Sequence, residues 1–435
     1  MIALALVVAA IILLVLWGLP VGFAFALGCF ALGTVYNIDL AAGAHVALAK
    51  LNSFAMLALP LYIFLGSLMR HAGLARRLID FVDSVVGRVR GGLGHVLIIS
   101  NGIFGAISGV AASALATMGT IMIPEMERFG YPRKYSISLA VCASVLSLMI
   151  PPSITMIIFG LASRQSIPLL FAATFVPGLI LMTLLCIVNL VLSRSIPTIV
   201  VPPKISFAAQ SKNVVRLGRK AFFTLMLPVV VLGGLYSGIF TPTESAAVAI
   251  IYALIIGFFV YRILTPKTMW KATIDAGRLT GTVVIILFFF LILSGILILQ
   301  EVPQILASSL MGLSSNKIIF LLILNVVLII LGMFMDDISS LLLAAIIFLP
   351  VAKIFGVHPL HFGAICCINL GMGLITPPVA PLLYLGAVVA GVPVKDFVKP
   401  VFYCLIFAFL PALLLTTYIP ELSLTLPRLL MAVWR

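Results

Sequence analysis

Charged side chains are scarce in this sequence. Only 9% of the 435 residues are Asp, Glu, Lys or Arg, whereas soluble domains carry about 25%. Because 63% of the residues are hydrophobic, no soluble core could bury them all, and a soluble enzyme is excluded. Among the charged residues, the acidic ones are the scarcer, 12 against 26 basic ones. In a chain this apolar, we interpret the net charge of +14 as a membrane-topology signal and exclude nucleic acid as a partner.

Motifs of enzymes and metal centres are also missing. The six cysteines lie in apolar stretches without the paired spacing of a zinc site or a disulfide framework. His358 and His361 lack a third metal ligand nearby. No HExxH, GxSxG or Walker sequence occurs, so neither hydrolysis nor direct use of ATP has support. We therefore predict a protein that is not an enzyme and has no organic cofactor.

Long apolar runs are abundant instead. Residues 1–16, 221–235, 279–299 and 318–335 approach or reach the roughly 20 residues that cross the hydrocarbon of a bilayer. The expected fold is an all-α polytopic membrane protein with ten crossings and two segments that enter the membrane and return. We expect a location in the bacterial inner membrane, in contact with lipid.

Basic residues gather in five clusters between these runs. The clusters are Arg70 to Arg90, Arg128 to Lys134, Arg194 to Lys220, Arg262 to Arg278, and Lys395 with Lys399. Cytoplasmic loops are enriched in Lys and Arg. All five clusters fall on the cytoplasmic side if residues 94–127 and 317–353 form re-entrant helical hairpins.

The second half of the chain repeats landmarks of the first half. Matching residues are 226 positions apart (350 − 124): Pro124 and Pro350, Gly130 and Gly356, Pro151 and Pro377, Pro152 and Pro378, Gly160 and Gly386, Ser113 and Ser339. The charge map places the first copy entering from the cytoplasm and the second from outside, so the repeats are inverted, as in many secondary transporters.

This repeat divides the chain into four predicted parts. They are residues 1–58, N-terminal scaffold helices with an interfacial arm; 59–194, the first inverted repeat with hairpin 1 (94–127); 195–278, a basic loop and central scaffold helices; and 279–435, the second inverted repeat with hairpin 2 (317–353).

A Pro-Pro pair interrupts an apolar span in each repeat. Such a pair removes two amide donors and leaves carbonyl oxygens free at membrane depth, where each polar group needs a partner. Oxygens of this kind bind a hard cation such as sodium. The candidates beside the two breaks are Ser147, Ser153, Asn369 and Thr376. A plain proline kink is the alternative, and its recurrence at the same spacing argues against it.

The hairpin tips supply the other half of each predicted site. Ser108 and Gly109 end the first arm, and Ser113 then lies near the amino terminus of the returning arm, where free amides attract anions. Asp336 and Asp337 occupy the second tip. Charges at this depth are costly, so we expect Asp336 to ligate sodium or to cap the helix, with a solvent-facing residue as the alternative. Glu244, in Thr241-Pro242-Thr243-Glu244, is predicted to complete a capping box.

Several of these strings together resemble the large membrane subunit of the tripartite ATP-independent periplasmic (TRAP) transporters. The matching strings are Leu59-Pro60-Leu61 with Gly66, Gly105 to Gly109, Ile150 to Ile154, Gly238 to Ala247, Gly332 to Asp336 and Asn369 to Pro378. The resemblance covers nearly the whole chain. It implies an elevator-type, sodium-driven importer of organic anions that works with a small four-helix membrane subunit and a periplasmic substrate-binding protein.

The resemblance also implies site residues. It places one sodium between the first tip and the first break, and another between the second tip and the second break. Sodium site 1 would use Ser108, Ser113, Ser147, Ile150 and Ser153, and sodium site 2 Asp336, Ser339, Gly373 and Thr376. The organic anion would contact Ser108, Gly109, Ser113, Ser153, Thr376 and Asn369. The chain departs from the family at Val110, Ala111 and Ala114, where relatives carry more serines or an acidic residue.

Two other functions compete with this one. A stand-alone ion or anion antiporter of the related fold would need no binding protein. An intramembrane hydrolase using Ser108 or the Asp336–Asp337 pair would need a base beside the nucleophile, and the sequence offers none for Ser108.

Overall fold

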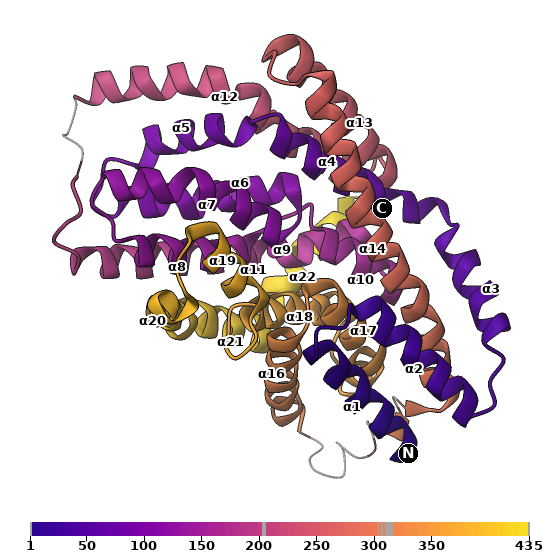
Figure 1. Cartoon of the computed structure of the whole chain (residues 1–435). Helices are drawn as coiled ribbons and strands as arrows, with labels where there is room; N and C mark the ends of the chain where they lie inside the picture. The colour runs from indigo at the N-terminus through magenta and orange to yellow at the C-terminus, as the bar shows by residue number, and fades with distance from the viewer. Residues whose placement is uncertain (1, 202–205, 303, 306–307, 309–315, 434–435) are drawn as a thin grey trace.

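The computed structural model describes residues 2–201, 206–302, 304–305, 308 and 316–433, and within these residues the chain is helical and has no strand (Figure 1). The first half contains α1 (Ile2–Leu16), α2 (Val21–Val35), α3 (Leu40–Leu51), η1 (Phe54–Leu57), α4 (Ala58–His71), α5 (Leu74–Val86), α6 (Gly92–Ser108), α7 (Ala111–Arg128), α8 (Arg133–Ser144), α9 (Leu146–Met149), α10 (Ile154–Ser163) and α11 (Ile167–Arg194). The second half contains α12 (Phe207–Tyr236), α13 (Pro242–Ile255), η2 (Ile256–Val260), α14 (Pro266–Leu299), α16 (Lys317–Phe334), α17 (Asp337–Ile354), α18 (Pro359–Gly373), α19 (Pro381–Ala390), α20 (Val394–Cys404), η3 (Leu405–Phe409), α21 (Leu410–Tyr418) and α22 (Glu421–Val433).

Seven of the described helical stretches are long and apolar enough to cross a bilayer, and the bent pair Arg133–Met149 and Ile154–Ser163 would make an eighth. Shorter apolar helices accompany them, among them α6, α18 and α19. The all-α polytopic membrane fold is therefore confirmed.

The element boundaries reproduce the internal repeat. Helix α6 ends at Ser108 and α16 at Phe334, while α7 and α17 have 18 residues each and begin 226 positions apart (337 − 111). The peptide bonds Pro151-Pro152 and Pro377-Pro378 are both cis. Each repeat thus consists of a helical hairpin followed by a helix that breaks at its Pro-Pro pair.

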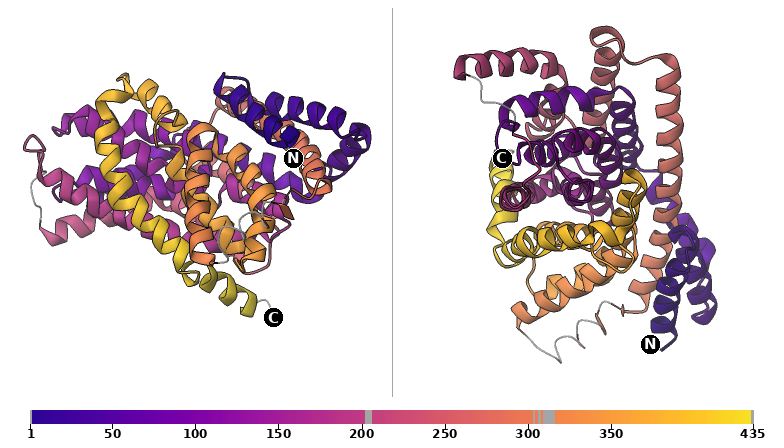
Figure 2. Two further views of the ribbon diagram at one scale, coloured as in Figure 1. Left: turned by 90° about the horizontal axis from the view of Figure 1, so that it is seen from below. Right: turned by 60° about the vertical axis from the view of Figure 1, so that its left-hand side comes forward.

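The two broken helices pack against each other in the middle of the molecule. The Cys367 thiol of α18 donates to the carbonyl of Leu148 in α9 at 3.1 Å. A Cβ added to Gly371 would lie 2.4 Å from the Val145 side chain, so the two helices approach closely here. Outside this core, α14 runs obliquely along α2, α3 and α4 (Figures 1 and 2).

Some helices begin earlier than hydropathy indicates. The predicted span 279–299 is the distal part of α14, whose 34 residues start at Pro266 behind a capping box of Thr265 and Thr268. Helix α12 begins at Phe207, where the Ser206 side chain accepts from the Ala209 amide. The basic residues in these extensions lower the hydropathy, so the extensions do not look like part of a membrane span. They are still helical, because a helix tolerates charged residues and its start is marked by a capping residue.

The capping box at the start of α13 is confirmed. The Thr241 amide donates to Glu244 Oε2 at 2.8 Å, and the Glu244 amide donates to Thr241 Oγ1 at 3.3 Å. Glu244 therefore satisfies a helix terminus, as its spacing predicts.

Candidate functional site

The first hairpin tip rests directly on the first helix break. A Cβ added to Gly105 would come within 2.6 Å of Ser147 Cα, so only glycine allows this approach. Gly109 adopts φ +62° and caps α6. Its carbonyl accepts a hydrogen bond from the Ile154 amide at 3.2 Å. The arm α6 and the start of α10 thus form one junction.

The second hairpin tip makes the equivalent junction. A Cβ added to Gly373 would lie 2.6 Å from Gly332 Cα, and one added to Gly332 would lie 2.8 Å from the Leu370 carbonyl oxygen. The Met333 carbonyl accepts from the Ala380 amide at 3.0 Å. The donors Ile154 and Ala380 are 226 residues apart (380 − 154), while the acceptors Gly109 and Met333 are 224 apart (333 − 109), so a similar backbone contact, shifted by two residues at the tip, occurs in both repeats.

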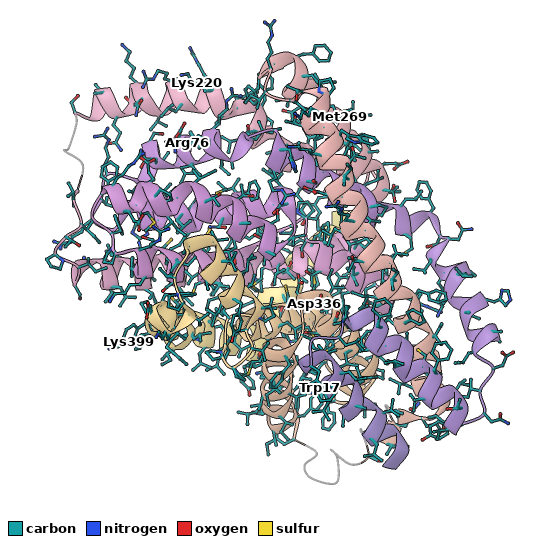
Figure 3. The ribbon with its side chains drawn as sticks, viewed as in Figure 1. Trp17, Arg76, Lys220, Met269, Asp336 and Lys399 are labelled. Carbon is teal, nitrogen blue, oxygen red and sulfur yellow. The ribbon has the colours of Figure 1, made fainter. Side chains whose placement is uncertain are left out.

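A side-chain bond joins the two junctions. The Thr155 hydroxyl, 2% exposed, donates to Asp337 Oδ2 at 3.2 Å. Through these three hydrogen bonds, the amino termini of α7, α10, α17 and α19 gather at the centre of the molecule, where Figure 3 shows Asp336. A helix amino terminus carries partial positive charge and unpaired amides. The arrangement therefore favours an anion.

Two of these four termini carry a side-chain cap and two do not. Ser153 accepts from the Met156 amide at 3.5 Å on α10, and Asp336 accepts from the Ile338 amide at 3.2 Å and the Ser339 amide at 3.4 Å on α17. At α7 and α19, the residues Val110 and Ala380 provide no side-chain cap. At α19, however, Pro381 has no amide hydrogen and the Leu382 amide donates to the Leu374 carbonyl at 3.1 Å. The first-turn amides of α7 are therefore the ones that a bound anion would satisfy.

Oxygen atoms suited to a cation lie beside the first junction. The hydroxyls of Ser108 and Ser147 are buried and have no hydrogen-bond partner among the described residues. A buried hydroxyl without a partner carries a desolvation cost, which a bound sodium ion would relieve. These residues fit the predicted ion.

The remaining predicted residues lie on the same elements. Ser113 is the third residue of α7 and lines a small cavity together with Ser108. Ile150 caps the end of α9. On the second side, Ser339 is fully buried and Thr376 donates to the Met372 carbonyl at 2.7 Å.

Asn369 belongs to a buried polar group one helical turn before the second break. Its amide donates to Asn325 Oδ1 at 2.9 Å and to the Ile365 carbonyl at 2.8 Å, and Thr417 also donates to Asn325 Oδ1, at 3.2 Å. Asn369 Oδ1 has no partner within the described part of the chain, so this oxygen stays available for a ligand.

A cavity of ≈ 70 Å³ is lined by residues of the first tip, α4 and α14. It is bordered by Ser108 and Ser113 on the hairpin and by Gly66, Arg70 and Asp275 opposite. Arg70 Nη2 and Asp275 Oδ2 are 2.6 Å apart. A Cβ on Gly66 would lie 2.8 Å from the Ser108 carbonyl oxygen, so the tip touches α4 about one helical turn from this ion pair.

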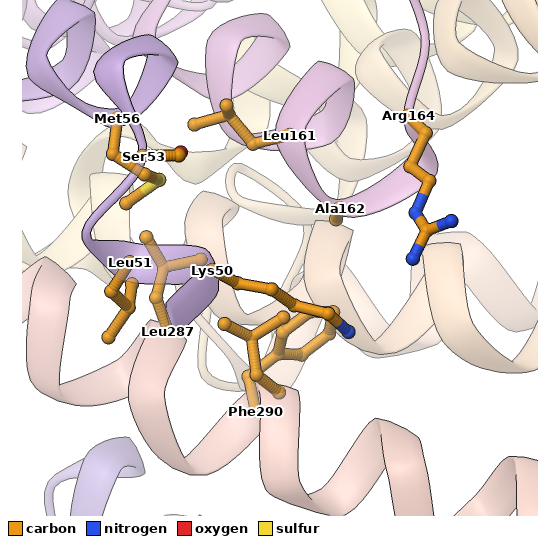
Figure 4. Close-up of a pocket in the computed structure, with 10 residues that line it drawn as sticks. Lys50, Leu51, Ser53, Met56, Leu161, Ala162, Arg164, Leu287 and Phe290 are labelled. Atoms are coloured by element: carbon orange, nitrogen blue, oxygen red, sulfur yellow. The ribbon is translucent and has the colours of Figure 1, made fainter. Parts of the chain in front are cut away.

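A second cavity, of ≈ 190 Å³, lies at the other end of α10 (Figure 4). Figure 4 shows Lys50, at the end of α3, and Arg164, the cap of α10, extending toward the same space above Phe290. Neither cation makes an ion pair within the described residues, and no acidic residue lines this cavity. Two unpaired cations facing one space make it electropositive.

Sequence reasoning missed three participants. Asp337 bonds the other repeat, although the sequence pattern at the tip pointed to Asp336; Thr155 and Ala380 were not among the predicted residues. Asp337 could have been recognised from the sequence, because it is adjacent to Asp336 at a predicted membrane depth where a charge is energetically costly. Ala380 carried none, since it acts through its backbone amide.

Comparison with known proteins places the chain among transporters. Residues 8–422 match the model of the family described as tripartite ATP-independent periplasmic transporter, DctM component. The C4-dicarboxylate TRAP transporter large permease protein DctM of Pseudomonas aeruginosa is 36% identical over 374 residues, 86% of each chain. The sialic acid TRAP transporter large permease protein SiaM of Vibrio cholerae is 33% identical over 421 residues, 95% of each chain. The isethionate TRAP transporter permease protein DctMQ of Oleidesulfovibrio alaskensis is 33% identical over 94% of this chain and 64% of its own length.

A solved structure shares the fold. The YdaH transporter of Alcanivorax borkumensis superposes with a TM-score of 0.64 over 87% of this chain and 88% of its own, at 14% identity. This likeness concerns the fold alone.

Proposed function

Because the chain belongs to the large membrane subunits of the tripartite ATP-independent periplasmic transporters, we propose that it imports a small organic anion, a carboxylate or sulfonate, coupled to sodium. A periplasmic substrate-binding protein would deliver the anion, and a small four-helix membrane subunit would complete the transporter. Relatives named for C4-dicarboxylates, sialic acid and isethionate support this class of substrate. Transport, not catalysis, is the activity of such permeases.

The convergence of four helix amino termini carries this proposal. The terminus of α7 has no side-chain cap, so an anion there would accept hydrogen bonds from its first-turn amides. The positive ends of the α10, α17 and α19 dipoles would attract the same anion. Binding by main-chain amides suits any carboxylate or sulfonate. The anion would then contact the predicted substrate-binding residues around these termini, namely Ser108, Gly109, Ser113, Ser153, Thr376 and Asn369.

Sodium would sit beside this anion. Site 1 would draw on the unpartnered hydroxyls of Ser108 and Ser147 together with Ser113, Ser153 and the Ile150 carbonyl. Site 2 would draw on Asp336, Ser339, Thr376 and the Gly373 carbonyl. Each sodium ion would place positive charge next to the anion. Sodium binding would therefore favour anion binding, and anion binding would favour sodium binding, by Coulomb attraction.

The position of the first tip along α14 supports an elevator mechanism. The tip borders Asp275, Ala276 and Leu279 on α14, at the cytoplasmic end of the apolar stretch 279–299. The outer end of α10 borders Leu287 and Phe290, about 14 Å short of the end of α14 at Leu299 by helical rise. We propose that the hairpins and broken helices are displaced toward the cytoplasm here and travel outward along α14.

Uptake by the reconstituted transporter tests the proposal. Proteoliposomes containing this chain and the small subunit, supplied with the binding protein, should accumulate one of succinate, isethionate or sialic acid under an inward sodium gradient. Replacing sodium with potassium should reduce uptake to background. Thermal-shift screening of the binding protein selects the anion beforehand. Uptake by this chain alone, without either partner or sodium, would contradict the proposal and favour the stand-alone antiporter.

The outer cavity gives a separate prediction. Neutralising both cations in Lys50→Gln/Arg164→Gln should raise the substrate KM roughly fivefold to tenfold while leaving the maximal rate within about twofold, because long-range attraction assists anion entry. The effect should shrink in 0.5 M salt, where screening is stronger. Lys353→Gln/Arg428→Gln is the matched control, since it removes the same charge away from this cavity. Equal KM values in the two double variants would contradict an electrostatic role.

A further inference from the structure

A basic cavity lies on the cytoplasmic side, away from the transport site. It has a volume of ≈ 480 Å³ and lies between α5, α12 and the end of η2. Its cations are Arg77, Arg219 and Lys220, and its one carboxylate is Asp80. Asp80 is engaged elsewhere, because its Oδ1 lies 3.1 Å from Arg76 Nε. Figure 3 shows Arg76 and Lys220 on the same side of the molecule.

The floor of this cavity is held rigid by Tyr261. The guanidinium carbon of Arg77 lies 3.5 Å from the centre of the Tyr261 ring, a cation–π contact. The Tyr261 hydroxyl donates to the Lys220 carbonyl at 2.8 Å, and the ring packs edge-on against Phe223 with centroids 6.4 Å apart. Arg77 is thus fixed in place. Its Nη1 is nonetheless buried without a hydrogen-bond partner among the described residues.

The wall of the cavity is apolar and exposed. Phe223 and Val260 line it with 38% and 45% of their surface exposed, and the neighbouring Phe259 is 74% exposed. Exposed Phe and Val beside a basic cluster match a ligand with an anionic head and an apolar tail. A free inorganic anion would gain nothing from contact with these apolar side chains.

We propose that this cavity binds the headgroup of an anionic phospholipid of the cytoplasmic leaflet. The phosphate would accept hydrogen bonds from Arg219 and Lys220 beside the positive charge of Arg77, and the acyl chains would lie along Phe223, Val260 and Phe259. Basic pockets between transmembrane helices on the cytoplasmic side bind such headgroups. The site joins α12 to α5, so a bound lipid would brace these two helices on the cytoplasmic side.

Native mass spectrometry of the purified full chain tests this site. Equimolar phosphatidylglycerol and phosphatidylcholine are added in detergent, and retained lipid is counted. The wild type should retain phosphatidylglycerol preferentially. Arg219→Gln/Lys220→Gln should weaken that retention by about fivefold for each cation removed. Lys267→Gln/Lys271→Gln, with the same charge change on α14 outside the cavity, should behave as wild type.

Three outcomes would overturn the proposal. One is equal loss of phosphatidylglycerol in both double variants, which would indicate general surface charge. Another is competition by millimolar glycerol 3-phosphate as strong as by the lipid, which would indicate a soluble phosphate site. The third is release of the lipid when the small membrane subunit binds, which would indicate that the cavity is a protein interface. A Phe223→Ala variant, which keeps every cation, should also lose phosphatidylglycerol, because the acyl chains lose part of their apolar contact.

Discussion

Gly373→Ala is expected to reduce sodium-driven uptake to below about a tenth of the wild-type rate. The added methyl group would lie 2.6 Å from Gly332 Cα and 2.6 Å from the Ile329 carbonyl oxygen, both backbone atoms that no rotamer change can move. Overpacking of this kind costs about 1–3 kcal/mol. The second tip would have to separate from the second break, which disrupts sodium site 2.

Gly281→Ala on α14 is the matched control. It makes the same chemical change within a helix, and its added Cβ would meet nothing within 4 Å. Uptake and protein yield should therefore equal the wild type. Melting temperature with and without sodium separates folding from binding: Gly373→Ala should fold but lose the sodium-induced increase. Wild-type uptake by Gly373→Ala would show that the close approach is not needed for transport.

Asp336→Asn is expected to raise the sodium concentration for half-maximal uptake about tenfold, roughly 1.4 kcal/mol of sodium binding. Asparagine keeps an oxygen that caps α17 but removes the negative charge. Asp336→Ala should lose both, adding a stability cost of about 0.5–2 kcal/mol. A sodium titration of uptake and a thermal melt of each variant separate the two roles.

Asp39 offers a control with the same chemistry in another place. It caps α3 by accepting from the Ala41 amide at 2.8 Å, and α3 carries no predicted sodium ligand. Asp39→Asn should leave the sodium titration unchanged. If Asp336→Asn also titrates like the wild type, Asp336 only caps its helix and must be removed from sodium site 2.

The sequence was most informative where backbone chemistry is unusual. Pro151 and Pro377 located both helix breaks, because proline removes an amide donor wherever it stands. Gly109 located the first tip for a similar reason, as its left-handed φ of +62° suits glycine. The Thr241–Glu244 capping box followed from spacing alone. The four-part division of the chain and the sodium ligand sets stay predictions.

Contacts between the repeats were beyond sequence reasoning. The Thr155–Asp337 bond joins residues 182 positions apart, and no periodicity encodes which helix of one repeat meets which hairpin of the other. Ala380 donates through its amide, so its side chain gives no clue. The length of α14 was missed because its charged first turns interrupt the apolar run that marks a span.

The oblique course of α14 restricts how this protein can move. Its 34 residues measure roughly 51 Å, well beyond the hydrocarbon thickness of about 30 Å, and it packs against α2, α3 and α4 along the way. Its first turns carry Lys267, Lys271 and Arg278, and an outward shift of the whole helix would place these charges in the hydrocarbon at high cost. In the proposed elevator mechanism, α14 therefore keeps its depth, and the displacement belongs to the parts that carry the proline breaks.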